Sequence, residues 1–209
     1  MENVIQTIAV YAIPVLFAIT VHEAAHGYVA RMFGDNTAYV LGRVTLNPVK
    51  HIDPIGTIVL PLGMAFFTPF IFGWAKPVPV DWSSLRRPKR DMIWVAAAGP
   101  AVNLVMAILW AILYSVLQAV GVQELFFFKV AEAGVSVNLV IMALNLLPIP
   151  PLDGGRIVAG LLPRNLSNAY SRIEPFGLFI IVGLLVTGAL SFVLQPFLAI
   201  GAAIVRIFA

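Results

Sequence analysis

Long apolar runs separated by short polar stretches dominate this chain. The runs at 4–33, 92–120 and 134–147 predict three membrane helices, and the run at 176–190 predicts a further helix. The last run, 192–208, either spans the membrane or lies against the other helices. The pattern therefore predicts an all-α polytopic membrane protein, with a core of three transmembrane helices and one or two C-terminal helices.

The stretch between the first two of these runs follows a different pattern. Residues 37–48 are rich in β-branched side chains and contain Gly42 near the middle, which predicts a short membrane-embedded β-hairpin. Residues 55–74 are apolar but are interrupted by glycine and proline. Such a segment is expected to be re-entrant, entering the membrane and returning on the same side.

Composition supports a membrane protein. Of 209 residues, 60% are hydrophobic and 11% are charged, and the mean hydropathy is +0.95. We expect one membrane-embedded domain over 1–209, with its core at about 4–160 and C-terminal helices at about 167–208. The first run lacks a preceding basic region, so we expect a retained helix rather than a cleaved signal. The sequence has no basic tail of the kind that would suggest a nucleic-acid partner, so none is expected.

Candidate chemistry begins inside the first apolar run, with His22, Glu23 and His26. Histidines at i and i+4 lie on one face of a helix, one turn apart, as two ligands of one Zn²⁺ require. Glu23 is then placed to act on a water molecule bound to that metal. A short motif can occur by chance, but ionisable groups at membrane depth are costly and usually mark a site.

A catalytic zinc usually has three protein ligands, so a third must come from elsewhere in the chain. His51 is possible, and Asp153 is the better candidate because it follows a proline-rich turn at the end of a membrane helix. His51 and the nearby Asp53 have two open interpretations. They either contact the site or substrate, or form a polar cap at the membrane surface.

Topology tests the choice of Asp153. If 55–74 is re-entrant, Asp153 reaches the same side of the membrane as His22 and His26; if 55–74 spans, it does not. The re-entrant topology leaves only Lys129 and possibly Arg206 on the opposite side. It gathers the other cations on one side, as the positive-inside rule expects: Arg31, Arg43, Lys50, Lys76, Arg86, Arg87, Lys89, Arg90, Arg156, Arg164 and Arg172.

Three segments together resemble the signatures of the site-2 proteases, which are intramembrane zinc metalloproteases. HEAAH at 22–26 resembles the zinc-binding helix of that family, AGPAVN at 98–103 its middle core helix, and NLLPIPPLDGG at 145–155 its second signature. The segment 73–80 and the predicted hairpin resemble its membrane-embedded β region. The chain is similar to the minimal form of the family, without PDZ-like or CBS-like domains.

The resemblance implies a zinc-dependent endopeptidase that cleaves transmembrane segments of membrane proteins in the lipid bilayer. It implies that His22, His26 and Asp153 bind one Zn²⁺ and that Glu23 is the general base. Asn103 is expected to donate a hydrogen bond to the developing oxyanion. The alternative for Asn103 is a hydrogen bond between helices.

The substrate's helix must unwind before hydrolysis, and the edge of the hairpin at 39–46 is expected to bind it as an added strand. The active site is expected towards the cytoplasmic side of a multi-pass protein in the cell membrane. Two other functions remain open from the sequence alone. One is a metal-ion transporter, and the other is an inactive protease-like binding protein.

Overall fold

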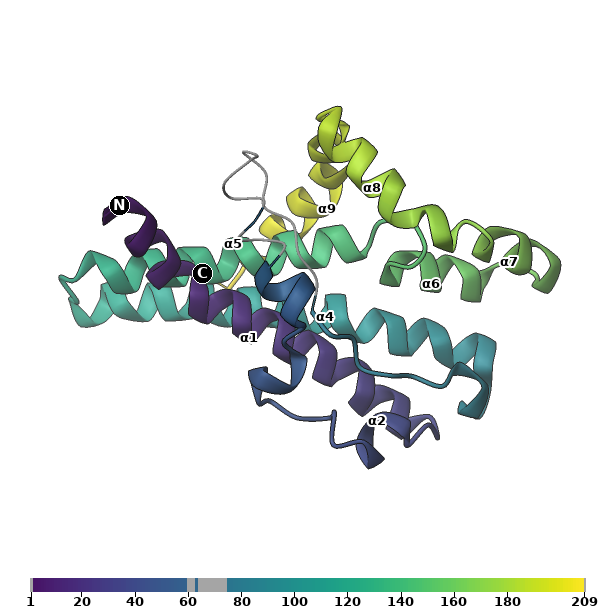
Figure 1. Cartoon of the computed structure of the whole chain (residues 1–209). Helices are drawn as coiled ribbons and strands as arrows, with labels where there is room; N and C mark the ends of the chain where they lie inside the picture. Colours follow the sequence, from purple (N-terminus) through teal and green to yellow (C-terminus); the bar gives the residue numbers. More distant parts are fainter. Residues whose placement is uncertain (1, 60–62, 64–74, 209) are drawn as a thin grey trace.

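The computed structural model describes residues 2–59, 63 and 75–208, and within these ranges the regular structure is helical, with no strand. Three long helices form the core: α1 (Glu2–Met32), α4 (Pro88–Val120) and α5 (Leu125–Asn145). Figure 1 shows α4 and α5 alongside each other, with α1 crossing them. Helix α1 packs against both. The expected all-α core is therefore confirmed.

The sequence explains the ends of these helices. Pro88 lies in the first turn of α4, where its missing N–H costs nothing, and Gly121 ends the helix with a positive φ of 77°. Helix α5 begins at Leu125, nine residues before the predicted start at 134. The charged Lys129 and Glu132 precede the apolar run, which is why the sequence predicts a later start, but both lie on exposed positions of the helix.

The predicted β-hairpin at 37–48 is wrong. Helix α2 (Thr37–Val40) occupies its first part, and the 3₁₀ turn η1 (Pro48–His51) follows it. Asp35 lies just before Asn36, the N-cap position of α2, and its Oδ1 accepts the backbone N–H of Thr37 at 2.9 Å in a local turn that leads into the helix. This local hydrogen bonding outweighs the β preference of the branched side chains. The hairpin edge at 39–46 is therefore not a strand that a substrate could extend.

The predicted re-entrant segment at 55–74 lies mostly outside the described residues. Its first part belongs to η2 (Pro54–Val59), a single turn of π-helix. Beyond it, residues 75–81 form extended chain that leads to η3 (Trp82–Ser84) and then to α4.

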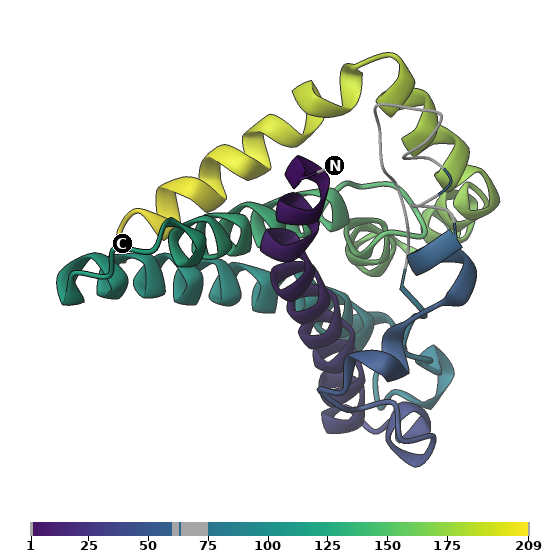
Figure 2. The same cartoon turned by 60° about the vertical axis from the view of Figure 1, so that its left-hand side comes forward.

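The C-terminal part is more helical than the sequence suggested. Two short helices, α6 (Asp153–Leu161) and α7 (Arg164–Ser171), lie between the predicted helical runs at 134–147 and 176–190. The turn η4 (Glu174–Phe176), α8 (Gly177–Val186) and α9 (Ala189–Val205) follow. Figure 2 shows α8 and α9 meeting at an angle and α9 returning along α5.

Small side chains allow the helices to approach closely. Ala107 and Ala111 of α4 pack with Leu139 and Met142 of α5 and Val205 of α9 in one buried cluster. In a membrane, association depends on such close packing, because lipid is as apolar as the side chains. Four helical stretches of the described chain are long and apolar enough to cross a membrane: Ile5–Met32, Pro88–Val120, Leu125–Asn145 and Arg164–Val186. The protein is therefore a multi-pass membrane protein.

Candidate metal centre

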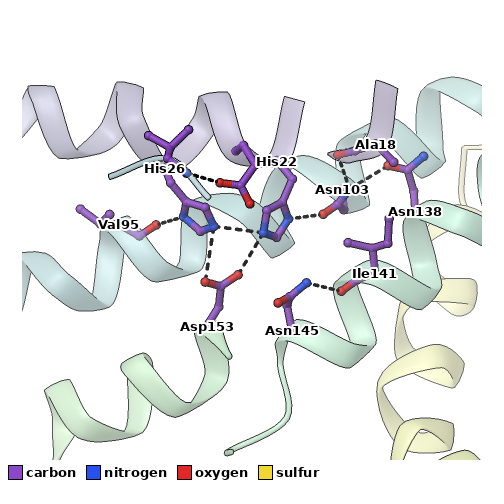
Figure 3. A network of polar contacts seen from close by, with 11 residues as sticks. Ala18, His22, His26, Val95, Asn103, Asn138, Ile141, Asn145 and Asp153 are labelled. Carbon is purple, nitrogen blue, oxygen red and sulfur yellow. Dashed lines mark hydrogen bonds and ion pairs between the residues drawn. The ribbon is translucent and has the colours of Figure 1, made fainter. Parts of the chain in front are cut away.

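Helix α1 carries both histidines of the predicted motif on one face. The Nε2 atoms of His22 and His26 lie 3.0 Å apart, one turn from each other along the helix (Figure 3). Their side chains are only 7% and 11% exposed. Two imidazoles are therefore held together away from water, as the spacing in the sequence predicts.

Asp153 joins them from a distant part of the chain. Its Oδ2 lies 3.2 Å from His22 Nε2, and its Oδ1 lies 3.4 Å from His26 Nε2 (Figure 3). Asp153 is the first residue of α6, directly after the turn that follows α5. Tyr170 fixes this turn, because its hydroxyl donates to the Pro148 carbonyl at 2.8 Å. The fold thus brings the third expected ligand to the first two.

The other ring nitrogens of both histidines are engaged by α4. His26 Nδ1–H donates to the Val95 carbonyl at 2.8 Å, and His22 Nδ1–H donates to Asn103 Oδ1 at 2.6 Å. A neutral imidazole has one ring proton, so both Nε2 atoms are left with a free lone pair. Such partners fix the tautomer and the orientation of a metal-binding histidine.

Gly99 allows α4 to lie this close to the imidazoles. A Cβ atom at this position would lie 2.5 Å from both His22 Cε1 and His26 Nε2. Any side chain here would push α4 away from α1 or displace the rings. The glycine is therefore required by the site rather than by the backbone conformation of the helix.

These three side chains fit a zinc ion. Their facing atoms are two lone pairs and a carboxylate, and the buried Asp153 Oδ2 has no hydrogen-bond donor. These nitrogen and oxygen atoms are ligand types that Zn²⁺ takes in proteins, and a cation between them would satisfy the unpartnered carboxylate oxygen. Tetrahedral ligands at 2.0–2.1 Å from Zn²⁺ lie about 3.3 Å from each other. The two Nε2 atoms lie 3.0 Å apart, one carboxylate oxygen lies 3.2 Å from His22 and the other lies 3.4 Å from His26, so the three side chains approach one another at about this spacing.

Glu23 lies between the two histidines in the sequence and is held by a segment far along the chain. Its Oε2 accepts the backbone N–H of Val78 at 2.7 Å. Val78 stands between Pro77 and Pro79, so this N–H is the only one in three residues. A residue before proline favours extended backbone, which keeps the N–H pointing in a fixed direction.

Asn103 is completely buried and contacts His22 rather than an open cavity. Its Nδ2 donates to Asn138 Oδ1 at 2.9 Å and to the Ala18 carbonyl at 3.3 Å. The amide therefore links three helices, as the alternative interpretation of its sequence position suggested. The expected oxyanion contact stays a prediction, and the donor it would require is already used within the protein.

His51 and Asp53 take part in local structure. His51 is buried, and its Nε2–H donates to the Thr45 carbonyl at 3.0 Å. Asp53 Oδ1 accepts the N–H groups of Ile55 and Gly56, which caps the turn η2. Within the described residues, the group that could hold a metal consists of His22, His26 and Asp153, without His51.

Sequence reasoning missed the groups that support the ligands. The Val95 carbonyl and the Val78 N–H belong to the backbone, so no residue type could reveal them. Asn138 gave a signal that could have been used, because it is an amide in the middle of an apolar helix.

Comparison with known proteins identifies the family. The model of peptidase family M50 matches residues 10–137 and 124–188. The chain belongs to peptidase family M50. This is the site-2 protease family that the sequence motifs resemble, so the protein is an intramembrane zinc metalloprotease.

Curated relatives named "Putative zinc metalloprotease" include YwhC of Bacillus subtilis and Rip2 of two mycobacteria. YwhC is 38% identical over 194 residues, which cover 90% of this chain and 85% of YwhC. Rip2 of Mycolicibacterium smegmatis is 32% identical, with 84% of this chain and 66% of Rip2 covered. Rip2 of Mycobacterium tuberculosis is 33% identical, with 82% and 63% covered. No solved structure matches this M50 peptidase.

Proposed function

We propose that this M50 peptidase hydrolyses peptide bonds at the site formed by His22, His26, Asp153 and Glu23. The first three residues would hold one Zn²⁺. The observation that carries this proposal is the convergence of three metal-ligand side chains from α1 and α6, beside an acidic side chain. Zinc bound here would lower the pKa of a water towards about 7 and polarise the scissile carbonyl.

Glu23 is the general base in this proposal. Because Val78 holds Oε2, the other carboxylate oxygen takes the proton from the attacking water and passes it to the leaving amine. Asn103 is proposed as a positioning residue, because it accepts the His22 Nδ1–H and keeps Nε2 free for the metal.

The proposed substrate is a transmembrane segment of another membrane protein in the bilayer. A helix hides its peptide bonds in its own hydrogen bonds, so the substrate must unwind near the site before hydrolysis. The histidines lie in the last third of α1, towards the end that carries Arg31. We propose that this end faces the cytoplasm, as the concentration of cations around it favours.

The decisive experiment compares the wild type with Glu23→Gln after purification in detergent. Zinc content is measured first, and cleavage of single-span membrane proteins second. We expect one zinc per chain in both proteins and a loss of roughly 100- to 10,000-fold in the rate of cleavage by the variant, because it lacks a general base. Alanine at His22 or Asp153 should remove the zinc itself.

The same experiment separates the rival functions. A metal-ion transporter needs no general base, so Glu23→Gln would leave zinc uptake into vesicles intact. A binding protein would retain zinc but cleave nothing in either form. Equal cleavage by the wild type and Glu23→Gln would refute the assignment of Glu23.

A further inference from the structure

A chain of polar contacts runs from α5 through α4 to the metal centre on α1 (Figure 3). Asn138 Nδ2 donates to the Gly134 carbonyl at 2.8 Å. Asn138 Oδ1 accepts from Asn103 Nδ2 at 2.9 Å, and Asn103 Oδ1 accepts from His22 Nδ1 at 2.6 Å. Both asparagines are completely buried, so no water competes for these contacts.

The groups at the two ends of this series of hydrogen bonds determine which atom donates and which accepts in each of them. A backbone carbonyl can only accept, so the amide nitrogen of Asn138 must face Gly134. Its oxygen therefore faces Asn103, which must present its own nitrogen. The Ala18 carbonyl, 3.3 Å from the same nitrogen, requires the same orientation. Asn103 is left with only its oxygen for His22, and the ring proton must lie on Nδ1.

Close packing of α4 on α5 brings the two amides within reach. A Cβ atom at position 134 would lie 2.2 Å from Cδ2 of Trp110, so Gly134 allows this approach. Burying two amides in an apolar bundle is unfavourable unless each finds partners. The contacts described above satisfy them, and they do so in only one orientation.

We propose that Asn138 is a positioning residue of the metal centre, which acts through Asn103 to keep the Nε2 lone pair of His22 free for zinc. The inference rests on the function proposed above. Without Asn138, only the longer 3.3 Å contact with the Ala18 carbonyl holds the Asn103 nitrogen, so a larger fraction of the Asn103 amides can turn over and present that nitrogen to His22. The ring would then accept at Nδ1 and carry its proton on Nε2, which blocks coordination.

Zinc affinity is the first test, measured on the purified full chain by competition with a chelator. Asn138→Ala and Asn103→Ala are each expected to weaken zinc binding by about 10- to 100-fold, as the loss of an outer partner of a ligand typically does. The double variant should bind zinc no more weakly than Asn103→Ala alone, because Asn138 acts only through Asn103.

The tautomer of His22 is the second test, and a purely structural role would not alter it. The chain has three histidines, so ¹⁵N spectra of the metal-free protein can be assigned by single substitution. At a pH where the ring is neutral, His22 should carry its proton on Nδ1 in the wild type. In Asn138→Ala, the fraction of His22 rings that carry the proton on Nε2 should increase. His51, whose Nε2–H donates to Thr45, serves as a reference for the opposite tautomer.

Two further variants control for the fold. Met142→Ala removes a buried apolar side chain from the same face of α5, so it should lower thermal stability without changing zinc affinity. Asn138→Leu fills the space with an apolar group. It replaces Asn138→Ala in the zinc-binding assay if that variant does not fold. It should weaken zinc binding to a similar extent.

The outcomes distinguish this inference from the proposed function. Wild-type zinc affinity and an unchanged His22 tautomer in the Asn138 variants would overturn the inference alone. An additive loss in the double variant would also overturn it, because Asn138 would then act by another route. A wild type that binds no zinc, or that binds it without His22, would instead refute the metal centre itself.

Discussion

Both histidines of the proposed zinc site, and the acidic Glu23 beside them, depend on a neighbour that contributes no charge. Val95 and Asn103 on α4 accept the Nδ1 protons of the two histidines, and Val78 donates to Glu23. Helix α4 thus does more than pack against α1. It determines which nitrogen of each imidazole is available, and this decides whether the pair can coordinate a metal at all.

A single methyl group at position 99 should disrupt the site. Gly99→Ala would place a Cβ 2.5 Å from both rings, so we expect zinc affinity to fall by at least about tenfold. The chelator competition assay measures this change. Gly183→Ala on α8 is the matched control, because no atom lies within 4 Å of its new Cβ. Equal zinc affinity in the two variants would contradict the close approach of α4.

At the scale of elements, the extended segment before α4 helps to position the site residues, as the helices do. It supplies the N–H of Val78, and its position follows from further contacts along its length. Lys76 N–H donates to the His51 carbonyl at 2.9 Å, and Asp81 N–H donates to Asp35 Oδ2 at 2.8 Å. The buried Asp35 thus connects the end of α1 to this segment.

Val78→Pro tests the contribution of this segment. Proline is compatible with extended chain but removes the N–H, so Glu23 loses its contact. We expect kcat to fall about tenfold or more, with little change in KM or zinc content, because substrate and metal binding do not use this group. Val78→Ala retains the N–H and is the control. A decrease of the same size in both variants would show that the side chain, not the N–H, matters.

The long apolar helices could be predicted from the sequence because their length and hydropathy dominate over other signals. The predicted hairpin failed because one carboxylate, Asp35, accepts the Thr37 N–H in a local turn that leads into α2, against the preference of the residues after it. The start of α5 was misplaced because two charged residues on its exposed face precede the apolar run. Helices α6 and α7 have only nine and eight residues, which is too short for an apolar repeat to be recognised with certainty.

The residues of the site could be predicted more completely than the fold around them. His22, His26 and Asp153 form one group in the described part of the chain, as their residue types and spacing suggested. The supporting backbone groups could not be predicted, because a carbonyl or N–H has no signature in the residue type. Asn103 was recognised as important, but its contact with His22 depends on how α4 packs against α1.

At the scale of the whole molecule, the proposed orientation can be tested directly. The sequence contains no cysteine, so a single introduced thiol reports one position. Asn168→Cys lies on the exposed surface of α7, and Gln123→Cys lies in the exposed turn between α4 and α5. In intact cells, an impermeant maleimide should label the Gln123 variant and not the Asn168 variant.

Inverted vesicles provide the control for this labelling, because they should give the reverse pattern. Retained zinc content in both variants would show that the thiols leave the fold intact. Labelling of both positions from the same side would contradict the proposed topology and the cytoplasmic placement of the site.

The position of Asp153 also has a consequence during biosynthesis. Both histidines and Glu23 enter the bilayer with the first helix, whereas the carboxylate that completes the ligand set is translated only after α5. If the site works as proposed, a growing polypeptide that has not reached α6 holds Glu23 and both imidazoles but lacks the third ligand. The order of the elements thus delays the proposed proteolytic competence until α1, α4 and α5 have all been translated.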